Sequence, residues 1–454
     1  MRLISGSSVF GRKRPLGLAL LGLVFSGAAS LHCSQPEPAK SPERIILIVV
    51  DTLRRDHVSA YAADPVRAKT PNIDRLAATG MIFENAVSAF HATTMSMAAL
   101  FTGRTPSIES ESREHTIEWN TFAFGGMSRF SVPGKDDASV PQALDTLAED
   151  LRAAGYWTLG VVSNELLYRP AGYDQGFDQW VEVGLPAPGQ KLNIFEAARL
   201  RTADDVNREV LAALEKRPSD RFFLYVHYID VHDWSLFRRS YEKSVERYDR
   251  QLGELLDRLA ADGLLEGATV VFTSDHGEML VEQHLNLKTS RHFGNPAFEP
   301  VLEIPLIVTP PIKADARAMI RSQDVRGMIG RIAGLDVRPA PDLEPDELFL
   351  TEMFYQTYRK GRWKSMWERT GDGHMLFDLV EDPHENVDLS KQRADILARH
   401  RERIDELSLA LVSGRGQAPT LSDEQLERLR ALGYIDTTTD EFRNREAIPE
   451  RPGT

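Results

Sequence analysis

Four short apolar runs most constrain the fold of this 454-residue chain, because each run is continuous rather than alternating. Continuous apolar runs are typical of central strands with both faces covered, as in parallel sheets. The segments between them show helical periodicity, which is the pattern of crossover units around such a sheet. We therefore predict an α/β fold with a mostly parallel central sheet flanked by helices. The runs are residues 45–50, 158–162, 222–226 and 269–272.

Polar residues that could bind a ligand or take part in catalysis follow each of these runs. They are Asp51, Asn164, His227 and Asp275. In open α/β sheets, ligands bind at the carboxyl ends of the strands. The arrangement therefore predicts a functional site at this edge of the sheet.

Apolar runs alternate with helical segments over residues 43–338, which we predict as the main domain, and this alternation ends after residue 338. Residues 105–139 within this domain lack periodicity and indicate a long insertion, either a pocket wall or a mobile loop. Residues 339–435 indicate a smaller C-terminal α+β subdomain with a charged amphipathic helix at 391–411, and residues 436–454 form a polar tail. The strands expected in the subdomain are residues 348–352, 362–368 and 375–379.

Residues 1–35 predict an export signal. Basic residues at positions 2 and 12–14 precede an apolar run at 16–25 and small residues at 26–30. The run is about half of the ~20 residues that a spanning helix requires, so an uncleaved membrane anchor is the weaker interpretation. We expect the protein to be exported to the bacterial periplasm or cell envelope.

The single cysteine, Cys33, excludes an intramolecular disulfide. It follows the apolar run and precedes a polar, Pro-rich stretch, where a bacterial lipoprotein carries its acylated cysteine. Leu31 and His32 depart from the small residue expected immediately before such a cysteine. Two alternatives stay open: membrane attachment through acylated Cys33, or cleavage after residues 28–30 that leaves Cys33 in a flexible leader.

The charge of the chain bears on its partners. The formal net charge is -13 and the pI is about 5.5, with no long basic stretch after the leader. This balance argues against a nucleic-acid partner, which requires cationic contacts to phosphates. Small or surface-borne substrates fit better.

Four residues far apart in the sequence offer a set of metal ligands. Asp51, Asp275 and His276 lie at the ends of predicted neighbouring strands, and Thr93 adds a hydroxyl. Two carboxylates, an imidazole and a hydroxyl suit one divalent ion, Ca²⁺, Mn²⁺, Mg²⁺ or Zn²⁺. Taken singly, each residue also has a structural explanation as a cap or turn former.

An ordered series of motifs runs along the chain. It includes RIILIVVDTLR at 44–54, TPNIDRL at 70–76, FENA at 83–86, TTMSMAALFTGR at 93–104 and TSDHGE at 273–278. The series resembles the sulfatase family of the alkaline-phosphatase-like superfamily, and it spans nearly all of residues 43–435 in the family's order, which is more specific than any single motif. The resemblance implies the sulfatase fold and puts Thr93 in the place of the nucleophile.

The nucleophile segment departs from the formylglycine pattern of the family. Thr93, Met95 and Met97 stand where that pattern has Cys or Ser, then Pro, then Arg. Threonine cannot become formylglycine, whereas relatives in the wider superfamily use threonine directly. The resemblance therefore implies a hydrolase of sulfuric or phosphoric (phosphonic) esters, with a metal-activated Thr93 and a covalent intermediate. Thr93 instead of formylglycine shifts the expectation towards phosphate or phosphonate esters without excluding sulfate.

The resemblance also assigns residues around the substrate. It makes His232 the contact to the substrate oxyanion or leaving group, with Lys288 and His292 as substrate-facing cations, while His227 is assigned a structural role. Lys288 has the alternative of a solvated loop charge. Asp230 and His232 are two residues apart rather than four, which favours one metal over two.

Three alternatives remain. Asn164 replaces the lysine that many sulfatases carry after the strand at 158–162, and this thins the anion-binding shell together with Met95 and Met97. A catalytically weak or inactive sulfatase-like surface lipoprotein that binds anionic glycans or a partner is therefore one alternative. Thr93 or Thr94 as a plain helix cap is another. The third concerns the substrate. It is either a small-molecule sulfate or phosphate ester, or such an ester carried on a glycan or a lipid.

Overall fold

The computed structural model describes residues 41–61, 66–106, 140, 144–185, 192–280, 282–285, 287–289, 296–337, 343–352, 355–369 and 371–410. The predictions for the leader with Cys33, for most of the insertion, for His292 and for the polar tail lie outside these residues. Within the described part, no helix combines the length and apolar character needed to cross a bilayer.

The main sheet has seven strands among the described residues, in the order β2-β10-β7-β1-β6-β4-β5. Strands β7, β1, β6, β4 and β5 run parallel, whereas β10 is antiparallel to both β7 and β2. This confirms the predicted mostly parallel sheet. The strands are β1 Arg44–Val50, β2 Met81–Ile82, β4 Trp157–Val162, β5 Gln179–Glu182, β6 Phe222–Tyr228, β7 Ala268–Ser274 and β10 Leu306–Thr309.

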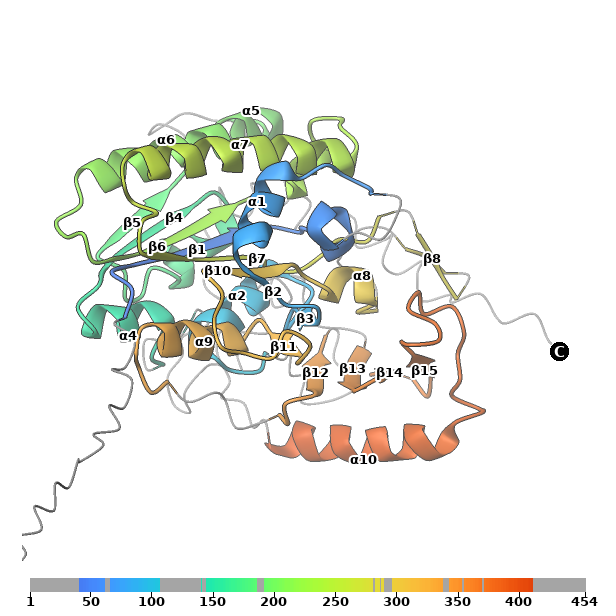
Figure 1. Ribbon diagram of the computed structural model, residues 1–454. Coiled ribbons are helices and arrows are strands. Elements are labelled where there is room, and N and C mark those ends of the chain that lie inside the picture. The colour runs from blue at the N-terminus through green and yellow to red at the C-terminus, as the bar shows by residue number, and fades with distance from the viewer. Residues whose placement is uncertain are drawn as a thin grey trace, which may run out of the picture. The chain divides into compact units, whose positions relative to one another are not determined.

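Helices cover both faces of this sheet, which explains why its central strands are apolar throughout (Figure 1). In β1, Ile45, Leu47 and Val49 belong to one core cluster, and the alternate residues belong to the other. The first cluster contains α2 Thr93–Thr102, α4 Leu147–Ala153 and α9 Asp324–Ile332, and the second contains α1 Pro71–Thr79, α6 Ala203–Glu215 and α7 Tyr241–Ala261.

Local sequence sets the ends of several helices. Helix α1 has Pro71 at its first position, where a missing N–H costs nothing. Helix α4 begins with a capping box, in which Thr146 accepts from the backbone of Glu149 and the Glu149 carboxylate accepts from Thr146 N. Helix α2 ends at Gly103, whose φ of 69° is in the left-handed region that favours glycine.

The C-terminal part confirms the predicted α+β character, with a four-stranded antiparallel sheet among the described residues and helix α10 Ala394–Ala410. The sequence pattern missed β13, because its alternating polar residues YQTYRK lack an apolar run. The predicted domain boundaries stay predictions. The strands are β12 Glu347–Thr351, β13 Tyr355–Lys360, β14 Trp363–Glu368 and β15 His374–Asp378.

Shorter elements complete the described chain. Two-stranded sheets join β3 Ala86–Val87 to β11 Ile320–Arg321 and β8 Glu282–His284 to β9 Leu287–Thr289. The short helices are α5 Ile194–Arg199, α8 Glu299–Leu302, η1 Arg55–His57, η2 Ser59–Tyr61, η4 Glu165–Leu167, η5 Arg169–Ala171 and η6 His232–Trp234.

Candidate active site

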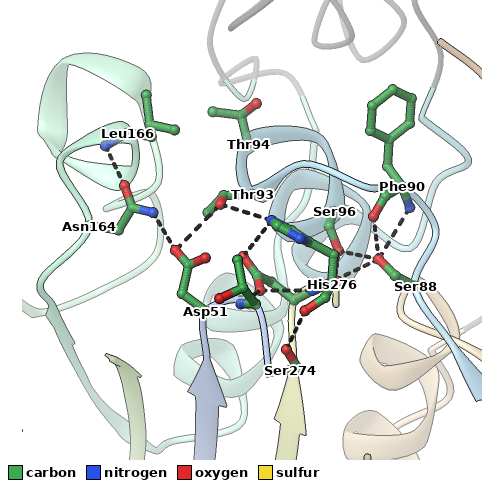
Figure 2. A network of polar contacts seen from close by, with 12 residues as sticks. Asp51, Ser88, Phe90, Thr93, Thr94, Ser96, Asn164, Leu166, Ser274 and His276 are labelled. Atoms are coloured by element: carbon green, nitrogen blue, oxygen red, sulfur yellow. Dashed lines mark hydrogen bonds and ion pairs between the residues drawn. The ribbon is translucent and has the colours of Figure 1, made fainter. Parts of the chain in front are cut away.

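The carboxyl edge of the sheet brings together the four residues predicted as metal ligands. Asp51 follows β1, and Asp275 and His276 follow the adjacent parallel strand β7, whose Ser274 is paired with Val50. Thr93 is the first residue of α2, and its side chain faces Asp51 and His276 (Figure 2). All four side chains are buried. The expected convergence of Asp51 and Asp275 is therefore observed.

The hydroxyl of Thr93 belongs to this cluster rather than to a helix cap. Its Oγ1 donates to Asp51 Oδ2 at 3.5 Å and lies 3.3 Å from His276 Nε2. The N-cap residue of α2 is Ala92, which makes no side-chain cap hydrogen bond. The arrangement therefore contradicts the alternative in which Thr93 or Thr94 caps α2 from the N-cap position.

The donor set fits a divalent cation. Asp51, Asp275 and His276 each offer one ligand atom, and these atoms lie within 4.8 Å of one another. Asp51 Oδ1 and Asp275 Oδ2 are buried and have no hydrogen-bond partner among the described residues. Buried polar atoms without a partner are rare because their desolvation is uncompensated. A cation held between the two carboxylates would supply that compensation.

The two carboxylates have pKa values shifted in opposite directions. Burial, followed by the charge of Asp51, raises the pKa of Asp275. Burial would also raise the pKa of Asp51, but the imidazoles of His227, His232 and His276 outweigh it and hold that pKa below its ordinary value. The site thus keeps Asp51 ionised beside a second carboxylate, which is electrostatically favourable only with positive charge nearby.

Backbone and side-chain contacts orient the loop after β7. Asp275 Oδ1 accepts from the backbone N–H groups of Thr52 (3.1 Å) and His276 (2.7 Å), which directs Oδ2 to the cluster. The φ of Thr52 is 59°, a strained value for a β-branched residue that places its N–H at Asp275. Ser88 and Ser96 each donate to the Asp275 carbonyl oxygen at 2.5 Å. Helix α2, which carries Thr93, is thereby tied to the loop.

His276 has its ring fixed from the opposite side. Its Nδ1 lies 2.7 Å from the carbonyl oxygen of Gly277, so Nε2 faces the cluster. Gly277 is required at this point, since an added Cβ would lie 2.0 Å from the Pro300 carbonyl oxygen. Fixing one ring nitrogen in this way is typical of metal-binding histidines.

Asn164 contacts Asp51, although the sequence assigned it no role beyond its position at the sheet edge and the replacement of a lysine. Its Nδ2 donates to Asp51 Oδ2 at 2.5 Å, and its Oδ1 accepts from Leu166 N at 2.9 Å (Figure 2). The second bond makes Asn164 the N-cap of η4. The residue therefore orients Asp51 from a rigid turn.

His227 lies at the cluster, although a structural role was expected for it. Its side chain is fully buried at the end of β6, with Nε2 3.5 Å from Asp51 Oδ2 and 4.0 Å from Asp275 Oδ2. The sequence feature that could have indicated this position was an apolar run followed by a histidine. The pairing of β6 with β1 places that histidine beside Asp51.

His232 begins η6 and is held by a buried ion pair. Its Nδ1 lies 3.1 Å from Asp233 Oδ1, and Arg201 donates to Asp233 at 2.9 Å. Burial acts against protonation of His232, but Asp233 and then Asp51 raise its pKa to about 9. His232 therefore holds a proton at neutral pH.

The remaining predicted site residues have different outcomes. Lys288 lies in β9, so its backbone position is described, whereas His292 lies outside the described residues. Met95 and Met97 are fully buried in apolar clusters. The two methionines therefore serve packing of α2 at the positions where the formylglycine pattern has Pro and Arg.

Comparisons with known proteins agree with this fold and motif order. Residues 43–326 match the model of the sulfatase family. The chain is 26% identical over 302 residues to N-acetylgalactosamine-6-sulfatase of Rattus norvegicus, covering 58% of this chain and 53% of that protein. It is 29% identical over 176 residues to choline-sulfatase of Rhizobium meliloti (strain 1021), covering 34% and 33%. The chain thus spans between a third and about half the length of these relatives.

Solved structures show the same fold. A putative sulfatase from Bacteroides thetaiotaomicron VPI-5482 superposes with a TM-score of 0.62 at 17% identity, covering 82% of this chain and 93% of that one. Phosphonate monoester hydrolase of Agrobacterium radiobacter gives a TM-score of 0.57 at 15% identity, covering 82% and 96%. Because the family model matches well over half of the sequence, this chain belongs to the sulfatase family.

Proposed function

We propose that this protein is a metal-dependent hydrolase of sulfuric, phosphoric or phosphonic esters in which Thr93 is the nucleophile. The observation that carries the proposal is the position of the Thr93 hydroxyl, which is buried between Asp51 and His276 at the start of α2. A helix N-terminus favours negative charge, which develops on the attacking and peripheral oxygens during the reaction.

The residues that would hold the ion are Asp51, Thr93, Asp275 and His276. When bound, a divalent ion there would lower the pKa of the Thr93 hydroxyl and offset charge on the substrate. No metal identity follows from these four residues alone, since Ca²⁺, Mn²⁺, Mg²⁺ and Zn²⁺ all accept such ligands.

The reaction proceeds in two displacements. Thr93 Oγ1 forms a bond to the central sulfur or phosphorus as the bond to the leaving oxygen breaks, and the hydroxyl proton passes to the medium. His232, which is protonated at neutral pH, gives a proton to the leaving oxygen. Water then attacks the central atom of the Thr93 ester, releases the acid and restores the hydroxyl.

Threonine favours phosphate or phosphonate esters over sulfate esters. A formylglycine hydrate expels sulfate by elimination from its second hydroxyl, whereas a threonine ester must be attacked at the central atom. Phosphoenzymes undergo that attack routinely. A phosphonate monoester hydrolase among the structures of the same fold is consistent with this choice. Sulfate esters remain the second candidate, since the family relatives act on them by name.

The alternative of an inactive surface lipoprotein is less well supported. Burying two carboxylates with unpartnered oxygens costs stability, and a binding scaffold has no reason to retain them. A glycan- or lipid-borne ester, or a small molecule, is the substrate class we propose. One structure of this fold contains a glucosamine disulfate as its substrate. Export to the bacterial envelope, with anchoring through Cys33 as its variant, belongs to the same proposal.

The test is a substrate panel on metal-loaded protein, with aryl sulfate, phosphate monoester, phosphate diester and phosphonate ester compared in wild type. Rapid acid quench and mass spectrometry should then find the phosphoryl or sulfuryl group on the peptide that contains Thr93. Hydrolysis of none of the four classes, together with retained binding of anionic glycans, would favour the binding-protein alternative.

A further inference from the structure

We propose that His227 is a further ligand of the metal ion, so that the site holds its ion with two imidazoles and selects a transition metal such as Zn²⁺ over Ca²⁺ and Mg²⁺. The inference rests on the metal site of the proposed function and adds a residue and a metal class to it.

Five potential ligand atoms form a closed ring in the structure. Starting at Thr93 Oγ1, the successive separations are 3.3 Å to His276 Nε2, then 3.5 Å to Asp275 Oδ2 and 4.0 Å to His227 Nε2. The ring closes over 3.5 Å from His227 Nε2 to Asp51 Oδ2 and 3.5 Å back to Thr93 Oγ1. Ligand atoms on one ion at bond lengths of ~2.0–2.4 Å lie about 3–4 Å apart. His227 therefore completes a set of the right size.

The Nε2 atom of His227 also supports its assignment as a ligand. Nε2 is fully buried and has no hydrogen-bond partner in the part of the chain that the structure describes, and the carboxylate oxygens of Asp51 and Asp275 lie 3.5 Å and 4.0 Å from it. Asp275 Oδ2, 4.0 Å from this nitrogen, also has no hydrogen-bond partner among the described residues. A buried nitrogen and a buried oxygen that face each other without bonding are both satisfied by one cation.

The other ring nitrogen has the partner that a metal-binding histidine requires. His227 Nδ1 lies 2.9 Å from the hydroxyl of Tyr225, two residues earlier on β6. When Nδ1–H donates to Tyr225, the lone pair of Nε2 is directed at the cluster, as in metal sites whose second nitrogen is hydrogen-bonded.

The strand itself directs His227 to this side of the sheet. Side chains alternate along β6, and Phe223 and Tyr225 lie in the same core cluster as helix α2, whereas Leu224 and Val226 lie in the other. His227 follows the alternation of Tyr225, so it shares the face on which α2 presents Thr93. The metal class follows from the ligands, since imidazole suits Zn²⁺ whereas Ca²⁺ and Mg²⁺ prefer oxygen.

The experiment counts imidazoles on the bound ion. X-ray absorption of Zn²⁺-loaded wild type should show two imidazoles, and His227→Ala should show one. Equilibrium dialysis should show at least about tenfold weaker Zn²⁺ binding in His227→Ala, with Ca²⁺ binding changed much less. The control is His400→Ala, which removes a buried imidazole in α10 and should leave both readouts at the wild-type value.

The outcomes separate this inference from the proposed function. Stoichiometric metal with one imidazole in wild type, or an unchanged imidazole count in His227→Ala, overturns the role of His227 and leaves the metal site standing. Wild-type protein that binds none of the four ions would overturn both. If His227→Ala does not fold, His227→Gln is measured instead, because its amide keeps most of the buried volume, and the same counts decide.

Discussion

Asn164 Nδ2 donates to Asp51 Oδ2 over 2.5 Å, so a neutral amide orients the carboxylate that follows the central strand β1. The same amide group caps η4 through Leu166 N, which fixes its direction. Asp51 Oδ1 is buried and has no hydrogen-bond partner among the described residues. Asn164, which stands where many sulfatases carry a lysine, thus orients a carboxylate that we propose as a metal ligand.

We expect Asn164→Ala to weaken metal binding by about 10–100-fold, because partners that orient metal ligands typically contribute that much. Equilibrium dialysis with Mn²⁺ or Zn²⁺ measures the change. Asn193→Ala is the control, since the exposed Asn193 also caps a helix, α5, by accepting from Glu196 N. Equal affinities in wild type and Asn164→Ala would show that Asp51 needs no amide partner.

Thr93→Ala should abolish turnover and leave the fold intact, because losing the hydroxyl contacts to Asp51 and His276 costs only about 0.5–1.5 kcal/mol each. Thr93→Ser should keep part of the activity, since the nucleophilic hydroxyl survives. Thr94→Ala serves as the neighbouring control and should be milder. Circular dichroism and steady-state kinetics give both readouts. Full activity in Thr93→Ala would assign the attack to water or to another residue.

Asp275→Ala should lose the bound metal, because Asp275 contributes a buried carboxylate oxygen to the cluster. Elemental analysis of purified protein should find stoichiometric metal in wild type and little in the variant. Asp230→Ala removes another buried carboxyl and should keep the metal. Equal metal contents in wild type and Asp275→Ala would remove Asp275 from the site.

The pKa of His232 predicts a pH dependence of stability. It is raised from 6.5 to about 9, against burial, by Asp233 and Asp51. A raised folded-state pKa stabilises the protein fully below about pH 6.5, and that contribution is lost as pH rises through 9. Urea unfolding of metal-free protein at pH 6 and pH 10 should show the loss in wild type and a smaller one in Asp233→Asn. An NMR titration of His232 near 6.5 would contradict the prediction.

A buried cation in the C-terminal sheet predicts a large effect on stability. Lys364 Nζ lies 2.9 Å from Glu299 Oε1 and 2.7 Å from Glu385 Oε1, and its side chain is fully buried. Lys364→Met should destabilise the protein by about 3–5 kcal/mol, because it removes the partner of buried carboxylates. Lys360→Met, in the adjacent strand β13 and partly exposed, should cost about 0–1 kcal/mol. Urea unfolding of both variants compares them, and similar losses would contradict the distinction.

The sequence by itself determined the strands and the edge that carries the site. A continuous apolar run such as that of β1 is stable only between two covered faces, and the residue after it, Asp51, must then lie at the carboxyl edge. The motif order added the family and the place of Thr93. These features depend on short stretches of chain, which is why they were predictable. Strand β13 was missed because its burial comes from its neighbours rather than from an apolar run of its own.

Only the tertiary structure decided which edge residues touch. The order β7-β1-β6-β4 places His227 and Asn164 on the side of Asp51 away from β7, and no periodicity in the sequence encodes that order. Strand order is set by packing of helices and loops between distant segments, and its contacts act over a few ångströms. A histidine or asparagine at a strand end therefore has the same local sequence whether it meets a carboxylate, as His227 and Asn164 do, or faces solvent.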